Sequence, residues 1–428
     1  MKKSVPLFLA VIFVFFSSSL SAQVSLSVSK KASSKIKMAV APFDLASGID
    51  AALASELKTA LSTDLNVSGY FSLISSSEVQ GLTQQKMLKW KQTGAEFLIL
   101  TQIALTGDRI KLECQVFNLN ESALVFSKKF EKEKRDRFRL MHEVSDAIVQ
   151  ELFGKPGLGS SRIAFVSNQS GSKQIHLIDW DGRNLIQLTK GANISIYPKW
   201  SPVAAQILCT DYSNRLPHIF VLDLTRQTKR PVSTRPGLNA FARYSPDGKK
   251  VVLTLSQDGN PEIYTCLSDG TQLRRLTKTK SVESSPCWTP DGKKVVFVSD
   301  QSGSPQIYWM NADGTGQERL TLRGRYNTSP EVSPDGKLIA YCSMEGGRFQ
   351  LFVLDPKTKE SVQVTRDPNS NEDPAWGPDS RHLAYTATQN YQSDVYLIDI
   401  YDGHPIRLTK GLKDCSSPSW SPAYSSTN

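Results

Sequence analysis

The chain has 428 residues, of which 39% are hydrophobic and 21% are charged, an ordinary composition for a folded protein. A chain of this length is expected to contain two or more hydrophobic cores, or one core assembled from repeats. The formal net charge is +10 at pH 7, but the positive charge is spread along the sequence, which argues against a dedicated nucleic-acid-binding surface.

The N-terminus has the features of a cleavable secretory signal. Lys2 and Lys3 precede ten uninterrupted apolar residues, Leu7 to Phe16, and a Ser-rich stretch follows. Ten apolar residues are too few to span a bilayer comfortably, and such flanks are typical of an export signal, cleaved here after Ser21 or Ala22. The mature chain is therefore expected to be exported and soluble.

The next segment alternates between strand and helix patterns. The strand patterns cover Lys37–Phe43, Phe71–Ile74, Glu96–Leu105, Arg109–Phe117 and Ala123–Phe130, and the helical patterns cover Ala46–Leu65, Glu78–Thr93 and Arg135–Phe153. Short turn sequences separate the last three strands, as in hairpins. This order predicts a small mixed-sheet α/β domain, followed by a Gly- and Pro-containing linker.

From residue 162 onward the chain consists of short strands and turns that repeat every 44 residues. A corner motif of the Trp-Ser-Pro-Asp-Gly type places its proline at positions 202, 246, 290, 334, 378 and 422. An aromatic slot keeps the same period at His176, Phe220, Tyr264, Tyr308, Phe352 and Tyr396. A hydroxyl slot does so at Thr189, Ser233, Thr277, Thr321, Thr365 and Thr409. Four strand patterns per repeat and this period predict a six-bladed β-propeller.

The phase of the repeats predicts how the ring closes. The set opens on the second strand pattern of a repeat, Arg162–Ser167, and ends on the first, Ser417–Trp420. The C-terminal strand is therefore expected to complete the blade of residues 162–189, which removes two exposed sheet edges. The predicted division is a signal peptide at 1–22, a flexible segment at 23–36, an α/β domain at 37–154, a linker at 155–161 and a propeller at 162–428.

The repeated corner favours a structural turn over a binding site. Pro presets its own backbone angle and Gly tolerates a positive φ. The corner aspartates Asp247, Asp291, Asp335 and Asp379 are distributed around a ring and do not converge on one cation. His176 occupies an aromatic slot and is expected to pack, and no metal site or cofactor is predicted. The six cysteines have irregular spacing, so mostly buried free thiols are expected, with room for one bridge.

Candidate binding residues lie in the loops just before the first strand of each repeat, because propellers bind ligands at the ends of their channel. One slot holds Tyr197, Phe241, Ser285, Ser329, Asp373 and Ser417. Nearby positions hold Asn239, Glu283, Asn327, Thr328, Glu372 and Asp414. This mixture of aromatic, hydroxyl and acidic groups suits a peptide or protein ligand, although ordinary polar loops would have a similar composition.

The signal peptide, the α/β domain, the Gly-Pro linker and six repeats of the W-S-P-D-G…R-L-T type together resemble the TolB family, the periplasmic components of Tol–Pal systems. The resemblance covers essentially the whole mature chain. The second repeat departs most, since its corner reads Ser201-Pro-Val-Ala, which weakens one corner of the resemblance but not the ring.

The resemblance implies a monomeric, non-enzymatic adaptor that supports outer-membrane integrity and constriction during division, and that colicins exploit. Such proteins bind Pal, a peptidoglycan-associated lipoprotein, at the channel mouth, and meet membranes only through partners. The Pal-binding residues would then be Tyr197, Asn239, Phe241, Glu283, Ser285, Thr328, Ser329, Glu372, Asp373 and Ser417. The inner-membrane TolA–TolQ–TolR machinery would contact the segment 23–34, in which Val24, Leu26 and Val28 alternate as in a strand that adds to a sheet.

Two other classes of function remain open at this point. An exported hydrolase, or a propeller module of one, would need a nucleophile–base–acid set, and the chain ends six residues past its last corner without a catalytic domain. A propeller that binds a small molecule or a cation in its channel is the third alternative.

Overall fold

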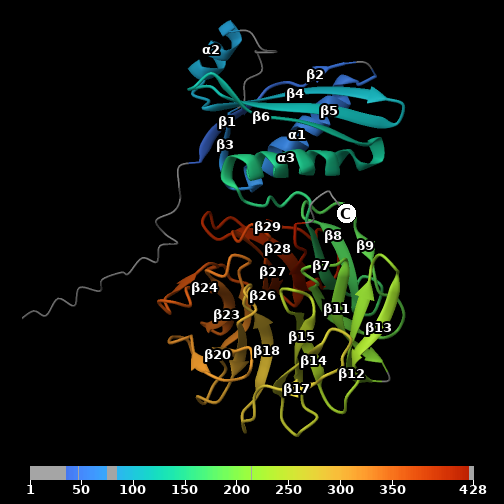
Figure 1. Cartoon of the computed structure of the whole chain (residues 1–428), viewed down its shortest axis with the longest axis vertical. Helices are drawn as coiled ribbons and strands as arrows, with labels where there is room; N and C mark the ends of the chain where they lie inside the picture. Colours follow the sequence, from blue (N-terminus) through green and yellow to red (C-terminus); the bar gives the residue numbers. More distant parts are fainter. Residues whose placement is uncertain (1–34, 47, 75–83, 214, 424–428) are drawn as a thin grey trace, which may run out of the picture.

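The computed structural model describes residues 35–46, 48–74, 84–213 and 215–423. They form a small N-terminal α/β domain followed by a six-bladed β-propeller (Figure 1), which confirms the predicted fold class. The predicted partner-binding strand with Val24, Leu26 and Val28 lies outside these ranges, as do residues 78–83 of the second predicted helix. Within them no helix is long and apolar enough to cross a membrane.

The N-terminal domain is the predicted mixed sheet with helices. Its elements are β1 (Ile36–Val40), β2 (Asp44–Leu45), α1 (Ala51–Val67), β3 (Phe71–Ile74), α2 (Gln84–Gln92), β4 (Phe97–Thr106), β5 (Arg109–Asn118), β6 (Ala123–Glu133), a 3₁₀ turn (Lys134–Asp136) and α3 (Arg137–Phe153). The strand order is β3-β1-β4-β5-β6, with β2 beside β4. β1 runs parallel to β3 and β4, and the long hairpins β4–β5–β6 are antiparallel.

The first helix starts later than its sequence pattern predicted. The Asp50 carboxylate accepts the N–H of Leu53 at 2.7 Å and so satisfies a group that has no partner within the helix. Helix α1 therefore begins at Ala51 instead of Ala46. The residues Asp44–Leu45 form β2, which adds a short parallel pairing to β4.

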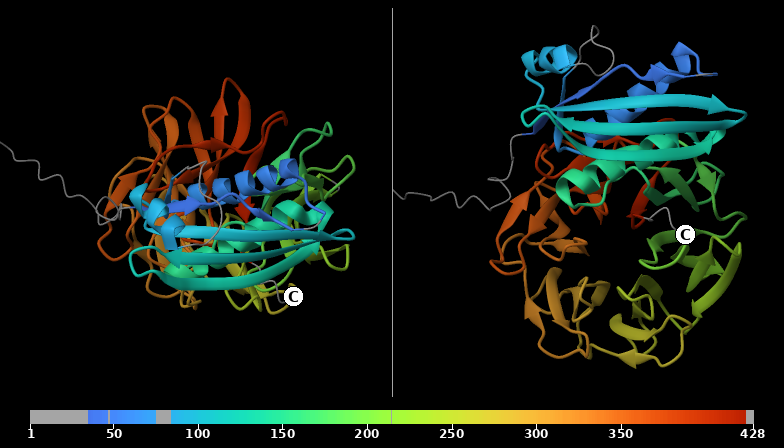
Figure 2. Two further views of the ribbon diagram at one scale, coloured as in Figure 1. Left: turned by 90° about the horizontal axis from the view of Figure 1, so that it is seen from above. Right: turned by 45° about the horizontal axis from the view of Figure 1, so that its top comes forward.

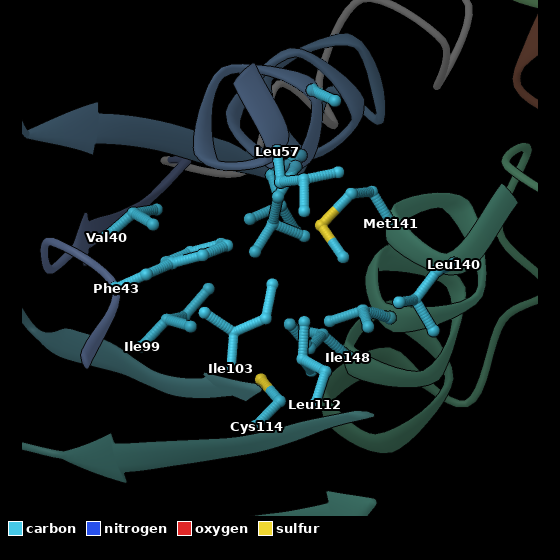
Figure 3. Packing of buried hydrophobic residues seen from close by; sticks show 14 of the residues in the cluster. Val40, Phe43, Leu57, Ile99, Ile103, Leu112, Cys114, Leu140, Met141 and Ile148 are labelled. Carbon is cyan, nitrogen blue, oxygen red and sulfur yellow. The ribbon is translucent and has the colours of Figure 1, made fainter. Parts of the chain in front are cut away.

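The core of this domain lies between one face of the sheet and the helices α1 and α3 (Figure 3). Leu57 of α1 and Met141 of α3 point toward Ile103, Leu112 and Cys114 of the sheet. All five side chains are at most 2% exposed. Helix α3 is therefore fixed on the sheet by its apolar face, and its opposite face is free to meet the propeller.

The propeller consists of six four-stranded antiparallel sheets. In chain order the strands are β7 (Arg162–Ser167), β8 (Gln174–Asp179), β9 (Ile186–Gln187), β10 (Ser195–Trp200), β11 (Gln206–Ser213), β12 (Leu216–Asp223), β13 (Thr228–Ser233), β14 (Asn239–Tyr244), β15 (Lys250–Leu255), β16 (Glu262–Leu267), β17 (Arg274–Arg275), β18 (Glu283–Trp288), β19 (Lys294–Ser299), β20 (Gln306–Asn311), β21 (Glu318–Arg319), β22 (Asn327–Val332), β23 (Ile339–Glu345), β24 (Arg348–Leu354), β25 (Ser361–Gln363), β26 (Ser370–Trp376), β27 (His382–Gln389), β28 (Gln392–Asp399), β29 (Ile406–Arg407) and β30 (Ser416–Trp420).

The ring closes as the phase of the repeats predicted. The last sheet has the order β30-β7-β8-β9, so the C-terminal strand is the inner strand of the first blade. Trp420 stands opposite Ile163 in the ladder, and its indole N–H donates to Ser161 Oγ at 2.6 Å. Figure 2 shows the blades arranged around a common axis.

The periodic slots of the sequence have structural roles. In the hydroxyl slot, Thr277 Oγ1 accepts the N–H of Ile263 at 2.8 Å, and the same bond recurs at positions 189, 321, 365 and 409. In the aromatic slot His176 packs against Phe165, with ring centroids 5.7 Å apart. In a corner, Asp247 Oδ1 accepts from Ser245 Oγ at 2.6 Å and from the N–H of Lys249 at 3.1 Å. All six cysteines, each within the described ranges, are buried and unbridged.

Every blade presents two different ends. At one end, the loop between blades bonds to the hairpin between the second and third strands, as when the N–H of Ser195 donates to the Lys173 carbonyl at 2.9 Å. We call this the mouth end. At the other end, the proline corners bond to the turns between the third and fourth strands, as from Ser268 N–H to the Lys249 carbonyl at 2.9 Å. We call this the corner end.

Candidate functional site

The six residues of the variable slot share one unusual backbone conformation. Tyr197, Phe241, Ser285, Ser329, Asp373 and Ser417 have φ between 51° and 54°. Each lies in a β-bulge of an inner strand, where the ladder to the second strand loses register. A bulge leaves a residue unpaired and redirects its side chain. Proline follows in every copy except Phe241, and it cannot donate to the ladder at that point.

These redirected side chains meet at the mouth end. All six line a single cavity of about 580 Å³, together with Thr328 and Glu372 of the predicted set. Hairpin and loop residues such as Lys173, Tyr391 and Asp414 form its outer wall. The structure thus brings together eight of the ten propeller residues that the sequence suggested.

The other two predicted residues do not reach this surface, and for them the prediction is wrong. Asn239 is fully buried, and its carboxamide accepts from Ser233 Oγ at 2.6 Å and donates to the Arg235 carbonyl at 2.7 Å. Glu283 is 1% exposed, and its carboxylate accepts from Thr279 Oγ1 and Ser299 Oγ. Both side chains hold the loop that precedes their strand.

The sequence did contain a signal for this structural role. The slot of Asn239 and Glu283 recurs 44 residues later as Asn327, whose Nδ2 donates to the Arg323 carbonyl at 2.8 Å and to Gln306 Oε1 at 2.7 Å. A polar residue type that returns at the same slot indicates a shared bond in the scaffold. The slot of the bulge, in contrast, changes from aromatic to hydroxyl to acidic.

The mouth has two chemically different sides. On one side the rings of Tyr197 and Phe241 lie 4.7 Å apart. On the other side Asp373 accepts from Ser417 Oγ at 3.0 Å, and Glu372 accepts from Ser370 Oγ at 2.9 Å. Burial, reinforced by Asp373, raises the pKa of Tyr197 to about 12, so its hydroxyl stays protonated and can donate.

A second ring of side chains lies deeper in the channel, two residues after each bulge. Its members are Lys199, Arg243, Cys287, Glu331, Ala375 and Ser419. Arg243 and Glu331 form an ion pair although they belong to blades that are not neighbours. Burial, and then Arg243, lower the pKa of Lys199 to about 8. The sequence reasoning missed this ring, although its period of 44 could have revealed it. Across the described part of the chain, no group of three His, Cys, Asp or Glu side chains has the arrangement of a metal site.

A further polar cluster joins the two domains at the corner end. His142 of α3 lies 2.7 Å from Asp64 Oδ2 through Nδ1, and 3.3 Å from Asp181 Oδ2 through Nε2. Asp64 belongs to α1, and Asp181 belongs to the turn between β8 and β9 of the propeller. The imidazole is 2% exposed and packs edge-on against Trp180, at 5.9 Å between ring centroids. We call these three residues the interdomain triad.

The linker and a second contact reinforce this interface. Asp146 of α3 accepts the N–H groups of Gly159 and Ser160, each at 2.7 Å. A side chain at Gly159 would place its Cβ 2.6 Å from the His142 carbonyl oxygen, so only glycine allows this approach. The Arg381 guanidinium lies 5.1 Å from the ring centre of Tyr70 and donates to Asp399 in the propeller. The N-terminal domain is therefore attached at the corner end, opposite the mouth. Figure 1 shows this domain on one side of the propeller, with α3 next to the blades.

Comparisons with known proteins agree with both domains. A family model described as the TolB amino-terminal domain matches residues 24–125, and one described as the TolB beta propeller domain matches residues 149–424. The chain belongs to the TolB family. It is 31% identical over 239 residues to the Tol-Pal system protein TolB of Desulfotalea psychrophila, an alignment of 55% of this chain and 54% of the relative. The corresponding protein of Desulfosudis oleivorans is 31% identical over 255 residues, with 57% and 58% covered.

Structural comparison extends this likeness to nearly the whole molecule. The crystal structure of TolB from Acinetobacter baumannii aligns with a TM-score of 0.81 and 27% identity, over 91% of this chain and 97% of that one. The sequence alignments are shorter, and in them the chain spans about half the length of the curated relatives it matches. Those relatives are named as Tol-Pal system proteins.

Proposed function

We propose that this chain is a non-enzymatic periplasmic adaptor of a Tol–Pal system. Its propeller binds a Pal-like peptidoglycan-associated lipoprotein at the mouth, and its N-terminal segment binds a TolA-like protein of the inner membrane. Through these contacts it supports outer-membrane integrity and constriction during cell division. Membership in the TolB family and the names of its relatives support this assignment.

The observation that supports the mouth most directly is the convergence of six redirected side chains on one cavity. A backbone with positive φ at non-glycine residues costs free energy, and such strain concentrates at functional sites. The cavity combines an aromatic wall with hydroxyl and carboxylate acceptors. This chemistry fits a protruding segment of a folded protein, which offers apolar area and N–H donors together.

The test is the affinity of the mature chain for the soluble domain of a Pal-like lipoprotein from the same organism, measured by isothermal titration calorimetry. Phe241→Ala combined with Asp373→Asn is expected to weaken binding at least about 10-fold, because it removes an aromatic contact and an acceptor from the mouth. Asp313→Asn, in an exposed turn of the corner end, is the matched control and should bind like the unaltered chain. Absence of binding at micromolar concentration would refute the proposal for the mouth.

The N-terminal segment is tested separately. A chain that begins at Lys35 lacks the segment 23–34 and keeps every described element. We expect it to lose binding to a TolA-like domain and to keep binding to the Pal-like domain. Retained affinity for the TolA-like domain would mean that the contact lies elsewhere.

A further inference from the structure

The loops at the two ends of the propeller differ in the sign of their charge. The mouth-end segments are 168–173, 189–194, 213–216, 233–238, 256–261, 277–282, 300–305, 321–326, 345–348, 365–369, 389–392 and 409–415. They contain twelve Lys and Arg but only five Asp and Glu. The corner-end segments are 180–185, 201–205, 224–227, 245–249, 268–273, 289–293, 312–317, 333–337, 355–360, 377–381 and 400–405. They contain eight Lys and Arg and ten Asp and Glu.

The basic side chains of the mouth end are available to a partner. Eleven of the twelve are exposed. One of these, Lys410, lines a cavity beside helix α1, and the other ten are Lys173, Lys190, Arg215, Lys278, Lys280, Arg323, Arg325, Arg348, Arg366 and Lys413. We call these ten residues the basic rim. Cations on the outer strands are paired, as in Arg275 with Asp258 and Arg407 with Asp394. No ion pair involves a member of the basic rim in the part of the chain that the structure describes.

Exposed apolar side chains accompany the basic rim. Ile194, Leu216, Val282, Leu322, Tyr326 and Tyr391 lie in the same mouth-end loops and are each at least 40% exposed. Tyr391 is 97% exposed at the tip of the hairpin between β27 and β28. Apolar groups that gather on one face of a protein mark an interaction surface. The mouth end therefore combines positive charge, exposed apolar area and a central hollow.

We infer that the mouth end binds an acidic protein surface, with negative charge arranged around a protruding segment that enters the cavity. This inference rests on the proposed function and specifies the chemistry of that partner. The hollow of about 580 Å³ calls for a convex ligand, which a planar lipid surface does not provide. At the centre, the carboxylates of Glu372 and Asp373 are complementary to N–H donors on the tip of the partner's protruding segment. The basic rim is complementary to carboxylates around that segment.

The charge difference between the ends also predicts the kinetics of association. Opposite charges on two partners accelerate their encounter, by about 10-fold to 1000-fold at low salt, and the effect falls as salt screens them. The interaction within the cavity is shielded and determines mainly how slowly the complex dissociates. The association rate constant should therefore decrease steeply with salt, whereas the dissociation rate constant should change little.

The experiment measures both rate constants by surface plasmon resonance, with the Pal-like soluble domain, at 50 mM and 500 mM salt. The test variant carries Lys278→Glu, Lys280→Glu, Arg323→Glu and Arg325→Glu in two adjacent mouth-end loops. The control variant carries Lys249→Glu, Lys293→Glu, Lys337→Glu and Lys357→Glu at the corner end, where all four side chains are also exposed. Both variants change the net charge by the same amount, and unchanged melting temperatures show that both are folded.

We expect association of the test variant to be at least about 10-fold slower at 50 mM salt and nearly independent of salt, and the control to behave like the unaltered chain. Equal association rates for the two variants would overturn the inference and leave the proposed function intact. Absence of binding by the unaltered chain would overturn both. Sedimentation with phosphatidylglycerol vesicles that is lost only in the test variant would assign the basic rim to an anionic lipid surface and overturn the protein partner.

Discussion

Replacement of His142 by alanine tests whether the interdomain triad holds the two domains together. Both ring nitrogens of His142 face carboxylate oxygens, at 2.7 and 3.3 Å, an arrangement that favours the protonated, positively charged imidazole. Burial opposes this charge, but the bonds to Asp181 and Asp64 outweigh it and raise the pKa of His142 to about 10. The variant leaves the buried Asp64 carboxylate without its counter-charge, whereas Asp181 keeps its ion pair with Arg183.

The expected loss in the free energy of unfolding follows from the raised pKa of His142. A histidine whose pKa rises from 6.5 to about 10 on folding contributes about 4 kcal/mol to the free energy of unfolding at pH 7. Loss of one partner of a buried ion pair typically costs about 3–5 kcal/mol, which agrees. The contribution is complete below the unfolded pKa and is lost as pH rises through the folded pKa. The difference between the unaltered chain and His142→Ala should therefore shrink between pH 7 and pH 10.

Urea denaturation followed by tryptophan fluorescence is a suitable assay, because Trp180 packs against His142 and reports on the interface. His176→Phe is the matched control. It also replaces a buried histidine, but one that bonds, among the residues described, to the Gln174 carbonyl and whose slot holds phenylalanine in two sister blades. We expect His176→Phe to lower the free energy of unfolding by less than about 1.5 kcal/mol. A loss below about 1 kcal/mol for His142→Ala at pH 7, or one that does not depend on pH, would refute the reasoning.

Three further variants test the ring and its mouth. Trp420→Ala should lower the free energy of unfolding by about 3–5 kcal/mol, because it empties a buried site in the closing strand. The control is Trp309→Ala at a half-buried site, for which thermal unfolding should show a clearly smaller loss. Equal losses for the two variants would contradict the role of closure. Burial raises the pKa of Glu283 to about 7, so the unaltered chain loses stability as pH rises through 7. Glu283→Asn, which copies Asn327, should therefore raise the melting temperature more at pH 8 than at pH 5, and an equal change at both would refute it. Tyr391→Ala should weaken partner binding in calorimetry without changing the melting temperature, and unchanged affinity would remove this side chain from the interface.

Much of the fold could be predicted because each repeat contains the complete strand and turn pattern of one blade. A blade buries its faces only against its neighbours. Six copies of a four-strand pattern with a period of 44 residues therefore already specify the number of blades and the strand order. The phase of the pattern predicted the pairing of β30 with β7. The start of α1 was predicted less well, because it depends on one side-chain bond from Asp50.

The candidate site was predicted in part, for a comparable reason. A slot that varies between copies pointed to the residues that line the mouth, such as Phe241 and Asp373. The same reasoning failed for Asn239 and Glu283, because a polar side chain in a loop can satisfy its hydrogen bonds inside or outside the protein. Which of these happens depends on the path of the loop backbone, as the bond from Asn239 to the Arg235 carbonyl illustrates.

By itself the sequence determined the architecture: the two domains, the six blades and the closure of the ring follow from local periodicity. Only the tertiary structure decided the interdomain triad, whose members at positions 64, 142 and 181 carry no common spacing. It also decided the distribution of charge. Successive turns of an antiparallel blade lie at opposite ends, so basic and acidic loops that alternate along the chain are separated in space. A positive charge that is spread along the sequence thereby becomes a basic rim at one end of the propeller.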